Sequence, residues 1–561
     1  MVRRPRSLSV VVVVSLVAFF ALSAPASAAS RYKIGSSNTV TADPYVSRPA
    51  TTPCVVQLFS DVAFENFNPY DFQFTPPASC PTPWQKVVFT ADISVTKGIQ
   101  YDRTANFWIG GANIYYGTTA EPSPSLSPKW HVETDLTDYS PLFTTAQDGQ
   151  ADIGNLVNGQ YTGVIYATAT LYFYPIDANE KPPTPFDQVL PMSASSDGGT
   201  VALNSGTDQL SETFTLPTNV VGAYLDVFAQ SQNDDEFWYT CVPNDVSGEL
   251  QSCGNTAFRE GEVTIDGQPA GVAPIYPWIF TGGIDPYLWF PMPGVQTLNF
   301  VPYRVNLTPF AGVLSNGQPH TVALSVYNAD DYFSATATLL LNLDSKSNTV
   351  TGAVTQDTLT ANPSPQVQEN LKTNNGDITG TVSVNSNRQF TIAGYIVSSA
   401  GTVQTSITQN VNFSSLQGFK VTSSEFIQNI AQTNAVTSTT TKTNGSNSRQ
   451  TYEEIAYPLN LDIHEVVNSN GTINLRTTAE QQNNSDGNVQ INGVQVSSFT
   501  RDNEVSPTDT LLLTSSGQII SHSGQKSSQH YSLFNSSGNC YDRALQAANN
   551  KLTAATRGCN K

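Results

Sequence analysis

The chain has 561 residues, of which only 13% are charged, and its 45 acidic against 26 basic residues give a formal net charge of −19 at pH 7. Nucleic acids and anionic membranes bind proteins through clustered Lys and Arg, so this composition argues against both as partners. The length exceeds what one hydrophobic core supports, which predicts roughly two to four domains.

The N-terminus has the pattern of a secretory signal peptide, expected over residues 1–28. Three arginines precede an apolar run from Val10 to Leu22, and Ala26-Ser27-Ala28 offers a small-residue cleavage site. The run is too short for a membrane span, and no later run approaches the roughly 18 apolar residues that a span needs. We therefore expect a secreted protein, extracellular or periplasmic, that does not associate with a membrane.

Short runs of alternating polar and apolar residues indicate an all-β protein. Examples are Val87 to Val95 and Tyr166 to Tyr174, and turn-forming Gly, Pro, Asn and Asp separate such runs at short intervals. This texture is typical of β sandwiches and jelly rolls. Polar breaks near residues 177–185 and 344–348 define three expected units: two jelly-roll-like β-sandwich lobes and a C-terminal β-rich accessory domain, covering residues 29–185, 186–345 and 346–561.

Two segments of the C-terminal unit depart from this texture. Tyr541 to Ala555 is the best helix candidate, and the Ser/Thr/Asn-rich stretch from Thr437 to Gln450 is expected to be a mobile loop. Aromatic faces are what sugar and peptide sites use for contact area, and the six tryptophans all precede residue 290. We therefore expect the chemistry in the first 345 residues.

The first lobe contains a charged pair at the edge of an aromatic hairpin. Asp102-Arg103 precedes an apolar run that includes Trp108, a Gly-Gly turn follows, and a second apolar run leads to Glu121. An arginine beside an aspartate can orient the carboxylate and keep it ionised. The alternative is a salt bridge at the end of a strand, and Glu121 could equally cap a loop.

The second lobe contains three acids followed directly by three aromatics, Asp234 to Tyr239. This order would set carboxylates against a stacking surface, with Cys241 and Cys253 bracing the loop; the alternative is a solvated acidic loop. Further along, Phe258-Arg-Glu-Gly-Glu262 heads a strand, where its charges could pair with each other. Carboxylates beside aromatics favour general acid/base work on a neutral substrate.

Other catalytic classes have little support in the sequence. No G-x-S-x-G elbow or phosphate-binding glycine loop is present, and the five histidines lack metal-binding spacings, so we expect no metal and no cofactor. Six cysteines in a secreted chain favour disulfides, and sequence-local pairing is the simplest arrangement. The expected pairs are Cys54 with Cys80, Cys241 with Cys253, and Cys540 with Cys559.

Several ordered blocks carry a family resemblance. They include Tyr101-Asp-Arg, Trp108-Ile-Gly-Gly, Thr119-Ala-Glu-Pro122, Trp130-His-Val-Glu, Asp234-Asp-Glu-Phe-Trp-Tyr239, Gly254-Asn-Thr-Ala-Phe-Arg-Glu260 and Phe280-Thr-Gly-Gly-Ile-Asp-Pro286. Together they resemble the plant and fungal peptide:N-glycosidase A family, from about residue 53 to the C-terminus and most strongly through residue 345. Tyr101-Asp-Arg-Thr-Ala-Asn106 is also similar to the Trp-Asp-Arg-Tyr-Ala-Asn run of the bacterial peptide:N-glycosidases F, which consist of two jelly rolls.

The resemblance implies hydrolysis of the amide between Asn and the first N-acetylglucosamine of an N-glycan, in N-glycosylated peptides and glycoproteins. That reaction requires no metal, and we expect no cofactor and a monomer. Asp102 takes the place of the catalytic aspartate, and Arg103 would fix it and polarise the carbonyl. Asn155 and Asn255 occupy the places of two supporting glutamates. Glu236 is therefore the preferred catalytic partner, with Glu260 next.

Further residues are expected to bind the substrate. Trp108, Trp130 and Trp238 could stack on the chitobiose core, and Asn155 and Asn255 could supply amide donors. Three charged residues complete the set: Glu121, Asp235 and Arg259. A site of carboxyl groups without histidine suits acidic pH. The alternatives are a glycoside hydrolase with paired carboxylates and a non-catalytic glycan-binding β-sandwich protein.

Overall fold

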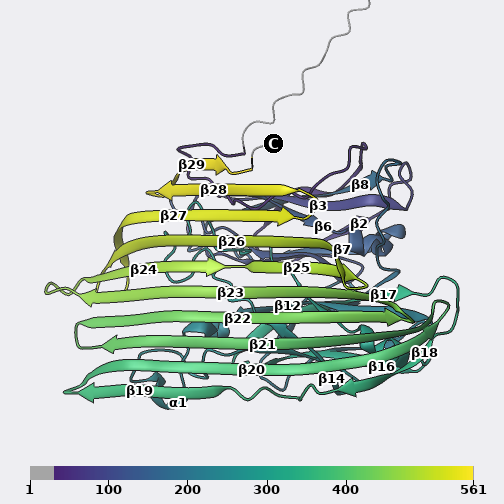
Figure 1. Cartoon of the computed structure of the whole chain (residues 1–561). Coiled ribbons are helices and arrows are strands. Elements are labelled where there is room, and N and C mark those ends of the chain that lie inside the picture. Colours follow the sequence, from purple (N-terminus) through teal and green to yellow (C-terminus); the bar gives the residue numbers. More distant parts are fainter. Residues whose placement is uncertain (1–30, 560–561) are drawn as a thin grey trace, which may run out of the picture.

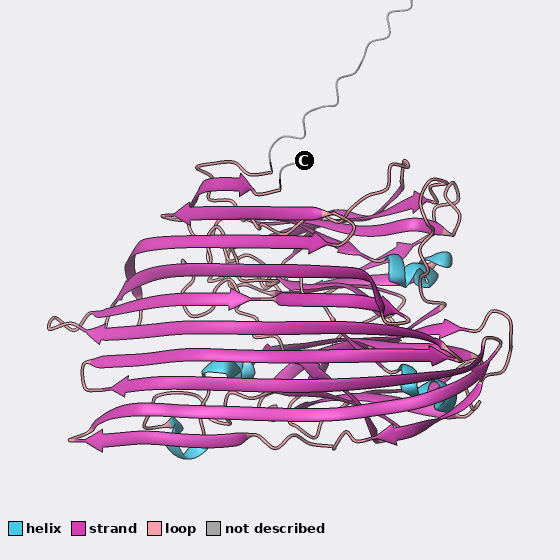
Figure 2. Ribbon diagram, viewed as in Figure 1, coloured by secondary structure: helices cyan, strands magenta, loops and turns pink. Residues whose placement is uncertain are grey.

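Alternating side chains dominate the chain, and they form strands almost throughout because successive residues of a strand point to opposite faces. The structure is a computed structural model that describes residues 31–559, so the expected signal peptide, residues 1–28, lies outside the described residues. Strand makes up 58% of the structure and helix 5%, which confirms the all-β class. Figure 2 shows how short the few helices are.

The first lobe is an eight-stranded jelly roll. Its elements are β1 (Cys54–Phe64), β2 (Tyr70–Phe74), β3 (Trp84–Val95), β4 (Thr104–Ile109), β5 (Ala112–Thr118), β6 (Lys129–Asp135), η1 (Thr137–Thr144), β7 (Gln147–Ile153) and β8 (Ile165–Pro175). The two sheets have the orders β1-β8-β3-β6 and β2-β7-β4-β5, as two interleaved Greek keys produce. They share one core, in which the rings of Phe89 and Phe107 lie 6.0 Å apart.

The second lobe repeats this topology. Its strands are β9 (Gln188–Met192), β10 (Val201–Leu203), β11 (Leu210–Thr215), β12 (Val220–Gln232), β13 (Glu260–Ile265), β14 (Gln268–Pro274), β15 (Tyr303–Asn306), β16 (Pro319–Tyr327) and β17 (Tyr332–Leu343). The orders β10-β17-β12-β15 and β11-β16-β13-β14 are again those of a jelly roll, with β9 added beside β17. Short helices lie in the connections: η2 (Asn233–Asp235), η3 (Trp238–Thr240), α1 (Asn244–Ser247), η4 (Thr308–Phe310) and α2 (Ala311–Leu314).

The C-terminal part forms a single 12-stranded antiparallel sheet. Its strands are β18 (Thr351–Asp357), β19 (Gln366–Asn374), β20 (Asp377–Ser398), β21 (Gly401–Val421), β22 (Glu425–Asn444), β23 (Asn447–Val467), β24 (Ile473–Gln482), β25 (Asn484–Ile491), β26 (Val494–Leu513), β27 (Ile519–Asn535), β28 (Cys540–Ala548) and β29 (Lys551–Arg557). The long strands β20, β21, β22, β23, β26 and β27 extend across the molecule, with the two lobes behind them in the view of Figure 1.

The C-terminal sheet and the second lobe share a hydrophobic core. Phe413 of β21 packs against Phe258 and Trp238 of the second lobe, at ring-centroid distances of 5.0 and 6.3 Å. Phe390 and Ile392 of β20 belong to the same buried cluster. Burying apolar surface is the main driving force of folding, so this sheet and the second lobe stabilise each other.

Two predictions for the C-terminal sheet are wrong. Tyr541 to Ala555 forms the hairpin β28–β29 instead of a helix, because Asn549 and Asn550 adopt φ values of 51° and 56° and make a tight turn. Thr437 to Gln450 forms the hairpin β22–β23 instead of a mobile loop. There Asn444 pairs with Asn447 across a two-residue turn that begins with Gly445, at φ 58°.

Two of the three expected disulfides are present, Cys241–Cys253 and Cys540–Cys559. The third expected pair is wrong in this structure, where Cys54 and Cys80 are free thiols. The Cys80 Sγ donates to the carbonyl of Phe173 at 3.4 Å, and burial together with the neighbouring Cys54 thiol raises the pKa of Cys80 to about 11. Among residues 31–559, no helix is long and apolar enough to cross a membrane.

Candidate active site

Asp102 lies directly before β4, where the first lobe meets the second. The β4–β5 hairpin turns at Gly110 and Gly111, which have φ values of 54° and 75°. At the open end of the hairpin, the Thr119 N–H donates to the Arg103 carbonyl at 2.9 Å. The Oδ2 of Asp102 accepts a hydrogen bond from the Gly282 N–H at 2.8 Å. Gly282 belongs to the segment between β14 and β15, so the second lobe fixes a carboxyl group of the first.

Glu121 follows β5 and lies against the same glycine. Its N–H donates to Thr281 Oγ1 at 2.9 Å, and its carboxyl group accepts a hydrogen bond from the Asp102 N–H. A Cβ on Gly282 would come within 2.1 Å of Glu121 Oε2 and 3.4 Å of Asp102 Oδ1. Both carboxyl groups therefore lie over Gly282, and only glycine leaves room for them as they stand.

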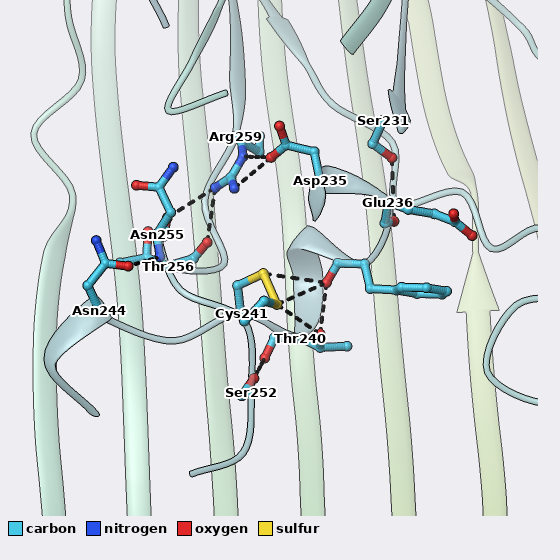
Figure 3. The surroundings of a disulfide bond; sticks show 12 residues. Ser231, Asp235, Glu236, Thr240, Cys241, Asn244, Ser252, Asn255, Thr256 and Arg259 are labelled. Carbon is cyan, nitrogen blue, oxygen red and sulfur yellow. Dashed lines mark hydrogen bonds and ion pairs between the residues drawn. A yellow bond between two sulfur atoms is a disulfide. The ribbon is translucent and has the colours of Figure 1, made fainter. Parts of the chain in front are cut away.

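Glu236 brings a third carboxyl group from the second lobe. The preceding residue, Asp235, is fully buried and accepts from Arg259 with an Nη2–Oδ1 distance of 2.7 Å. Figure 3 shows Asp235 turned toward Arg259 and Glu236 pointing away from that pair. Burial and, to a smaller extent, the charge of Asp102 raise the pKa of Glu236. We call Asp102, Glu121 and Glu236 the carboxyl cluster.

The carboxyl cluster favours protonated glutamates. Burial raises the pKa of Glu121 to about 8 and that of Glu236 to about 7, and the charge of Asp102 adds to both increases. Burial also raises the pKa of Asp102, but the Gly282 N–H and the charge of Arg103 oppose that rise. In mildly acidic solution, Glu121 and Glu236 are therefore carboxylic acids.

Arg103 acts on Asp102 without a direct ion pair. Its Nε and Nη2 donate to Gln100 Oε1 at 3.1 and 2.6 Å, and its guanidinium lies 5.6 Å from the centre of the Tyr101 ring. Across the part of the chain that the structure describes, no ion pair within 4.0 Å joins Arg103 to Asp102. The expected salt bridge at the strand end is therefore wrong, and so is the expectation that Arg103 fixes Asp102 directly. Arg103 instead acts on Asp102 through a longer-range electrostatic effect.

The tryptophans expected to stack on sugars are buried. Trp108 and Trp238 have no exposed surface and Trp130 retains 6%. Trp130 packs in the core of the first lobe, Trp238 packs against Phe413 of the C-terminal sheet, and Trp108 lies against Gly198. Stacking on Trp108 or Trp238 is therefore wrong for this structure. Partly exposed aromatic rings near the carboxyl cluster include those of Tyr101, which is 53% exposed, and Phe237.

The two expected amide donors are engaged by the fold. Asn155 is fully buried, and its Nδ2 donates to the carbonyls of Phe64 and Gly163 at 2.8 and 3.2 Å. Asn255 adopts φ 68°, and its Nδ2 donates to the Asn328 carbonyl at 2.9 Å. Both side chains stabilise loops, so the expectation that Asn155 donates to substrate is wrong and Asn255 has a structural role.

Glu260, Asp235 and Arg259 also have structural environments. Glu260 is 2% exposed and pairs with Arg388 of β20, which joins the second lobe to the C-terminal sheet. Asp235 accepts from the N–H groups of Asp330 and Asp331 in addition to Arg259. These three side chains are inaccessible to substrate, which corrects the catalytic role expected for Glu260 and the binding roles expected for the other two.

Gly282 is the functional residue that residue-by-residue reading misses. Its block, Phe280-Thr-Gly-Gly-Ile-Asp-Pro286, is visible in the sequence, but nothing local shows that its N–H meets a residue 180 positions away. Among residues 31–559, no group of His, Cys, Asp and Glu has the arrangement of a metal site.

The fold and the carboxyl cluster together define a class: two-lobed jelly-roll proteins with an acidic site where the lobes meet. The family described as peptide N-acetyl-beta-D-glucosaminyl asparaginase amidase A matches residues 44–411, and the chain belongs to this family. This range includes all three residues of the carboxyl cluster.

Among known proteins, peptide-N4-(N-acetyl-beta-glucosaminyl)asparagine amidase A of Prunus dulcis is 30% identical over 389 residues, which are 65% of this chain and 66% of that protein, just under two thirds of its length. PNGF-II in a C2 crystal form has a TM-score of 0.38 and 13% identity, over 52% of this chain and 65% of that chain. PNGase F of Flavobacterium meningosepticum has a TM-score of 0.37 and 14% identity, over 52% of this chain and 96% of that chain.

Proposed function

We propose that the protein is an N-glycan-releasing amidase, which hydrolyses the bond between an Asn side chain and the first N-acetylglucosamine. Membership of the family and the name of the Prunus dulcis relative support this activity. One observation carries it at the level of residues: the Asp102 carboxyl group is held by the Gly282 N–H, and its charge helps to raise the pKa values of two glutamates, Glu121 and Glu236.

The reaction needs a base, an acid and a held water molecule. The Asp102 carboxylate orients a water and accepts its proton as the water oxygen bonds to the amide carbon. When the C–N bond breaks, the protonated Glu236 gives its proton to the leaving nitrogen. The products are an Asp side chain and a glycosylamine, which then loses ammonia in water without catalysis.

The remaining groups stabilise charge and bind the sugar. A protonated Glu121 can donate to the oxygen of the amide, where negative charge develops in the transition state. The positive charge of Arg103, held beside Gln100 and Tyr101, favours the ionised form of Asp102. The exposed ring of Tyr101 and the partly exposed ring of Phe237 offer faces on which a sugar can stack.

This mechanism requires an acidic pH optimum. Glu236 donates a proton only below its pKa of about 7, and Glu121 only below about 8. Activity should therefore be highest in mild acid and fall as the pH rises through 7 and then 8. An activity profile with its maximum above about pH 8 would contradict the assigned roles.

The proposed substrates are N-glycosylated peptides and glycoproteins, and we propose that the enzyme acts as a secreted monomer outside the cell or in the periplasm. The signal-like N-terminus and the disulfides Cys241–Cys253 and Cys540–Cys559 support an oxidising compartment.

Analysis of both products of one glycopeptide tests the proposal. The amidase leaves Asp on the peptide and both core N-acetylglucosamines on the glycan, whereas an endoglycosidase leaves one sugar on Asn. Asp102→Asn should abolish glycan release and retain glycopeptide binding. If wild type and Asp102→Asn both bind and neither releases glycan above background, the chain is a glycan-binding protein and the proposal is wrong.

A further inference from the structure

The segment that carries Gly282 rests on the C-terminal sheet. This segment, residues 275–302, connects β14 to β15 and has no strand of its own. Long connections without regular structure are commonly functional and need outside contacts to hold one conformation. Polar side chains of the sheet supply such contacts, with Gln481 Nε2 donating to the Pro277 carbonyl at 2.6 Å and Gln525 Nε2 donating to the Phe290 carbonyl at 2.7 Å.

A pair of buried carboxyl groups lies in this interface. Asp285 of the segment is 0% exposed and Asp509 of β26 is 1% exposed, and the two groups are within hydrogen-bonding reach of each other. Asp285 Oδ1 accepts from the Tyr287 N–H at 2.9 Å, whereas its buried Oδ2 has no donor among the described residues. Two adjacent buried carboxyl groups of this kind are stable only when they share a proton.

The other charged and titratable groups facing the pair come from neighbouring elements. His522 of β27 has its Nδ1 3.4 Å from Asp509 Oδ2, and its ring stacks on that of Tyr287 with centroids 3.8 Å apart and planes 7° apart. Arg476 of β24, the strand paired with β26, directs its guanidinium to Asp462 at 3.7 Å. Loss of the shared proton at high pH makes the charge of this contact more negative.

We propose that Asp509 is a positioning residue of the active site, which holds Asp285 through a shared proton and thereby keeps residues 275–302 docked and the Gly282 N–H on Asp102. This inference rests on the proposed function for its catalytic meaning. It also gives the C-terminal sheet a role in catalysis, although no residue of the sheet belongs to the carboxyl cluster.

The connection from the pair to Gly282 is short. The Asp285 N–H donates to the Gly283 carbonyl at 2.7 Å, and Trp289 Nε1 donates to the same oxygen at 3.0 Å. Burial and the charge of Asp509 raise the pKa of Asp285 to about 7. Above that pH both groups ionise, two buried negative charges repel each other, and the turn at Gly282 and Gly283 loses its support.

Amide hydrogen exchange tests the docking without any substrate. In the full-length wild type, protection of residues 275–302, corrected for the intrinsic pH dependence of exchange, should fall about tenfold between about pH 6 and pH 8. Asp509→Asn donates to Asp285 whether or not Asp285 is ionised, so its protection should be the same at both pH values. The control Asp486→Asn, an exposed position of β25, should behave like the wild type.

Kinetics connect the docking to the active site. At about pH 6, Asp509→Ala should lower kcat with little change in KM, and Asp509→Asn should restore most of kcat. The inference is overturned if wild-type protection does not depend on pH, if Asp509→Asn retains the wild-type dependence, or if Asp509→Ala changes KM alone. Because exchange is measured without substrate, a failure of the proposed function would leave the exchange result standing, so the two failures are distinguishable.

Discussion

At the scale of single residues, the site depends on three carboxyl groups that differ in their tendency to ionise. Burial raises the pKa of Asp102, and the Gly282 N–H and the charge of Arg103 oppose that rise by favouring the carboxylate form. Glu121 and Glu236 are raised by burial and by the charge of Asp102, so they remain acids at a pH where Asp102 can be ionised. In the proposed mechanism, these different environments assign the role of base to Asp102 and the role of acid to the two glutamates.

Glu236 should determine the first fall of activity at rising pH. With Glu236→Gln, kcat should drop about a hundredfold or more and the decline near pH 7 should disappear, because no titrating donor remains at that position. The pH dependence of kcat on a glycopeptide checks this expectation.

The matched control is Glu262→Gln, since burial raises the pKa of Glu262 to about 7 as well, but its carboxyl group lies 3.2 Å from Arg388. A profile altered equally by both substitutions would refute the role of Glu236 as proton donor.

Gly282 should be intolerant of a side chain. With Gly282→Ala, the new Cβ would lie 2.1 Å from Glu121 Oε2, so Glu121 must move while the fold persists. Displacing a reacting group by about 1 Å can cost about a hundredfold in rate, and we expect a loss of kcat of that order without a change in melting temperature. Gly159→Ala, where a Cβ meets nothing within 4 Å, should be neutral in both measurements.

At the scale of elements, a buried ion pair sets the direction of Glu236. Arg259 and Asp235 are 1% and 0% exposed, and with Arg259→Met the Asp235 charge would stay buried without its main partner. Such a loss costs about 3–5 kcal/mol of the free energy of unfolding. Urea unfolding at constant pH measures it.

Arg476→Met removes an exposed pair with Asp462 at 3.7 Å and should cost under about 1 kcal/mol. Equal losses in the two variants would show that Arg259 has no special structural role.

The sequence predicts the elements that have short-range signals. Alternating runs predict the strands of both lobes, and the Gly-Gly turn predicts the β4–β5 hairpin. The hairpin β28–β29 has a signal of the same kind at Asn549-Asn550, but its alanines and two leucines also suit a helix, and pairing with β27 decides the outcome. Sheet pairing between strands overrides local propensity here.

The same limit applies to the site. The sequence indicates Asp102 and Glu236 as acids beside aromatics, and the structure brings both into the carboxyl cluster. The sequence cannot show that Trp108 and Trp238 are buried, because burial depends on how the lobes and the C-terminal sheet pack. Nor can it show contacts across long sequence separations, such as Asp285 with Asp509.

At the scale of the whole molecule, stability should be greatest in mild acid. The folded protein holds protons on Glu121, Glu236, Glu262 and Asp285 up to about pH 7–8, whereas the unfolded chain releases them near its ordinary values of about 4. Raising the pH from about 4.5 to 8 therefore favours the unfolded state.

Two further residues, Glu133 and His131, affect how the stability of the folded state depends on pH. Hydrogen bonds from His131 and Arg48 lower the pKa of Glu133 to about 2, so its contribution is lost only as the pH falls toward that value. Hydrogen bonds to Asp92 and Glu133 outweigh burial and raise the pKa of His131 to about 9, so its contribution is lost as the pH rises through 9. The urea midpoint at about pH 5 should exceed that at about pH 8, and the reverse order would contradict the assigned protonation states.

The most direct measurement of the central claim is the fate of heavy oxygen. A glycopeptide digested in water enriched in heavy oxygen should gain one heavy oxygen in the side chain of a newly formed Asp, and its released glycan should keep both core N-acetylglucosamines. Asp102→Asn should give no such product. A peptide that keeps Asn with one sugar attached, or a conversion unaffected by Asp102→Asn, would contradict amide hydrolysis by the carboxyl cluster.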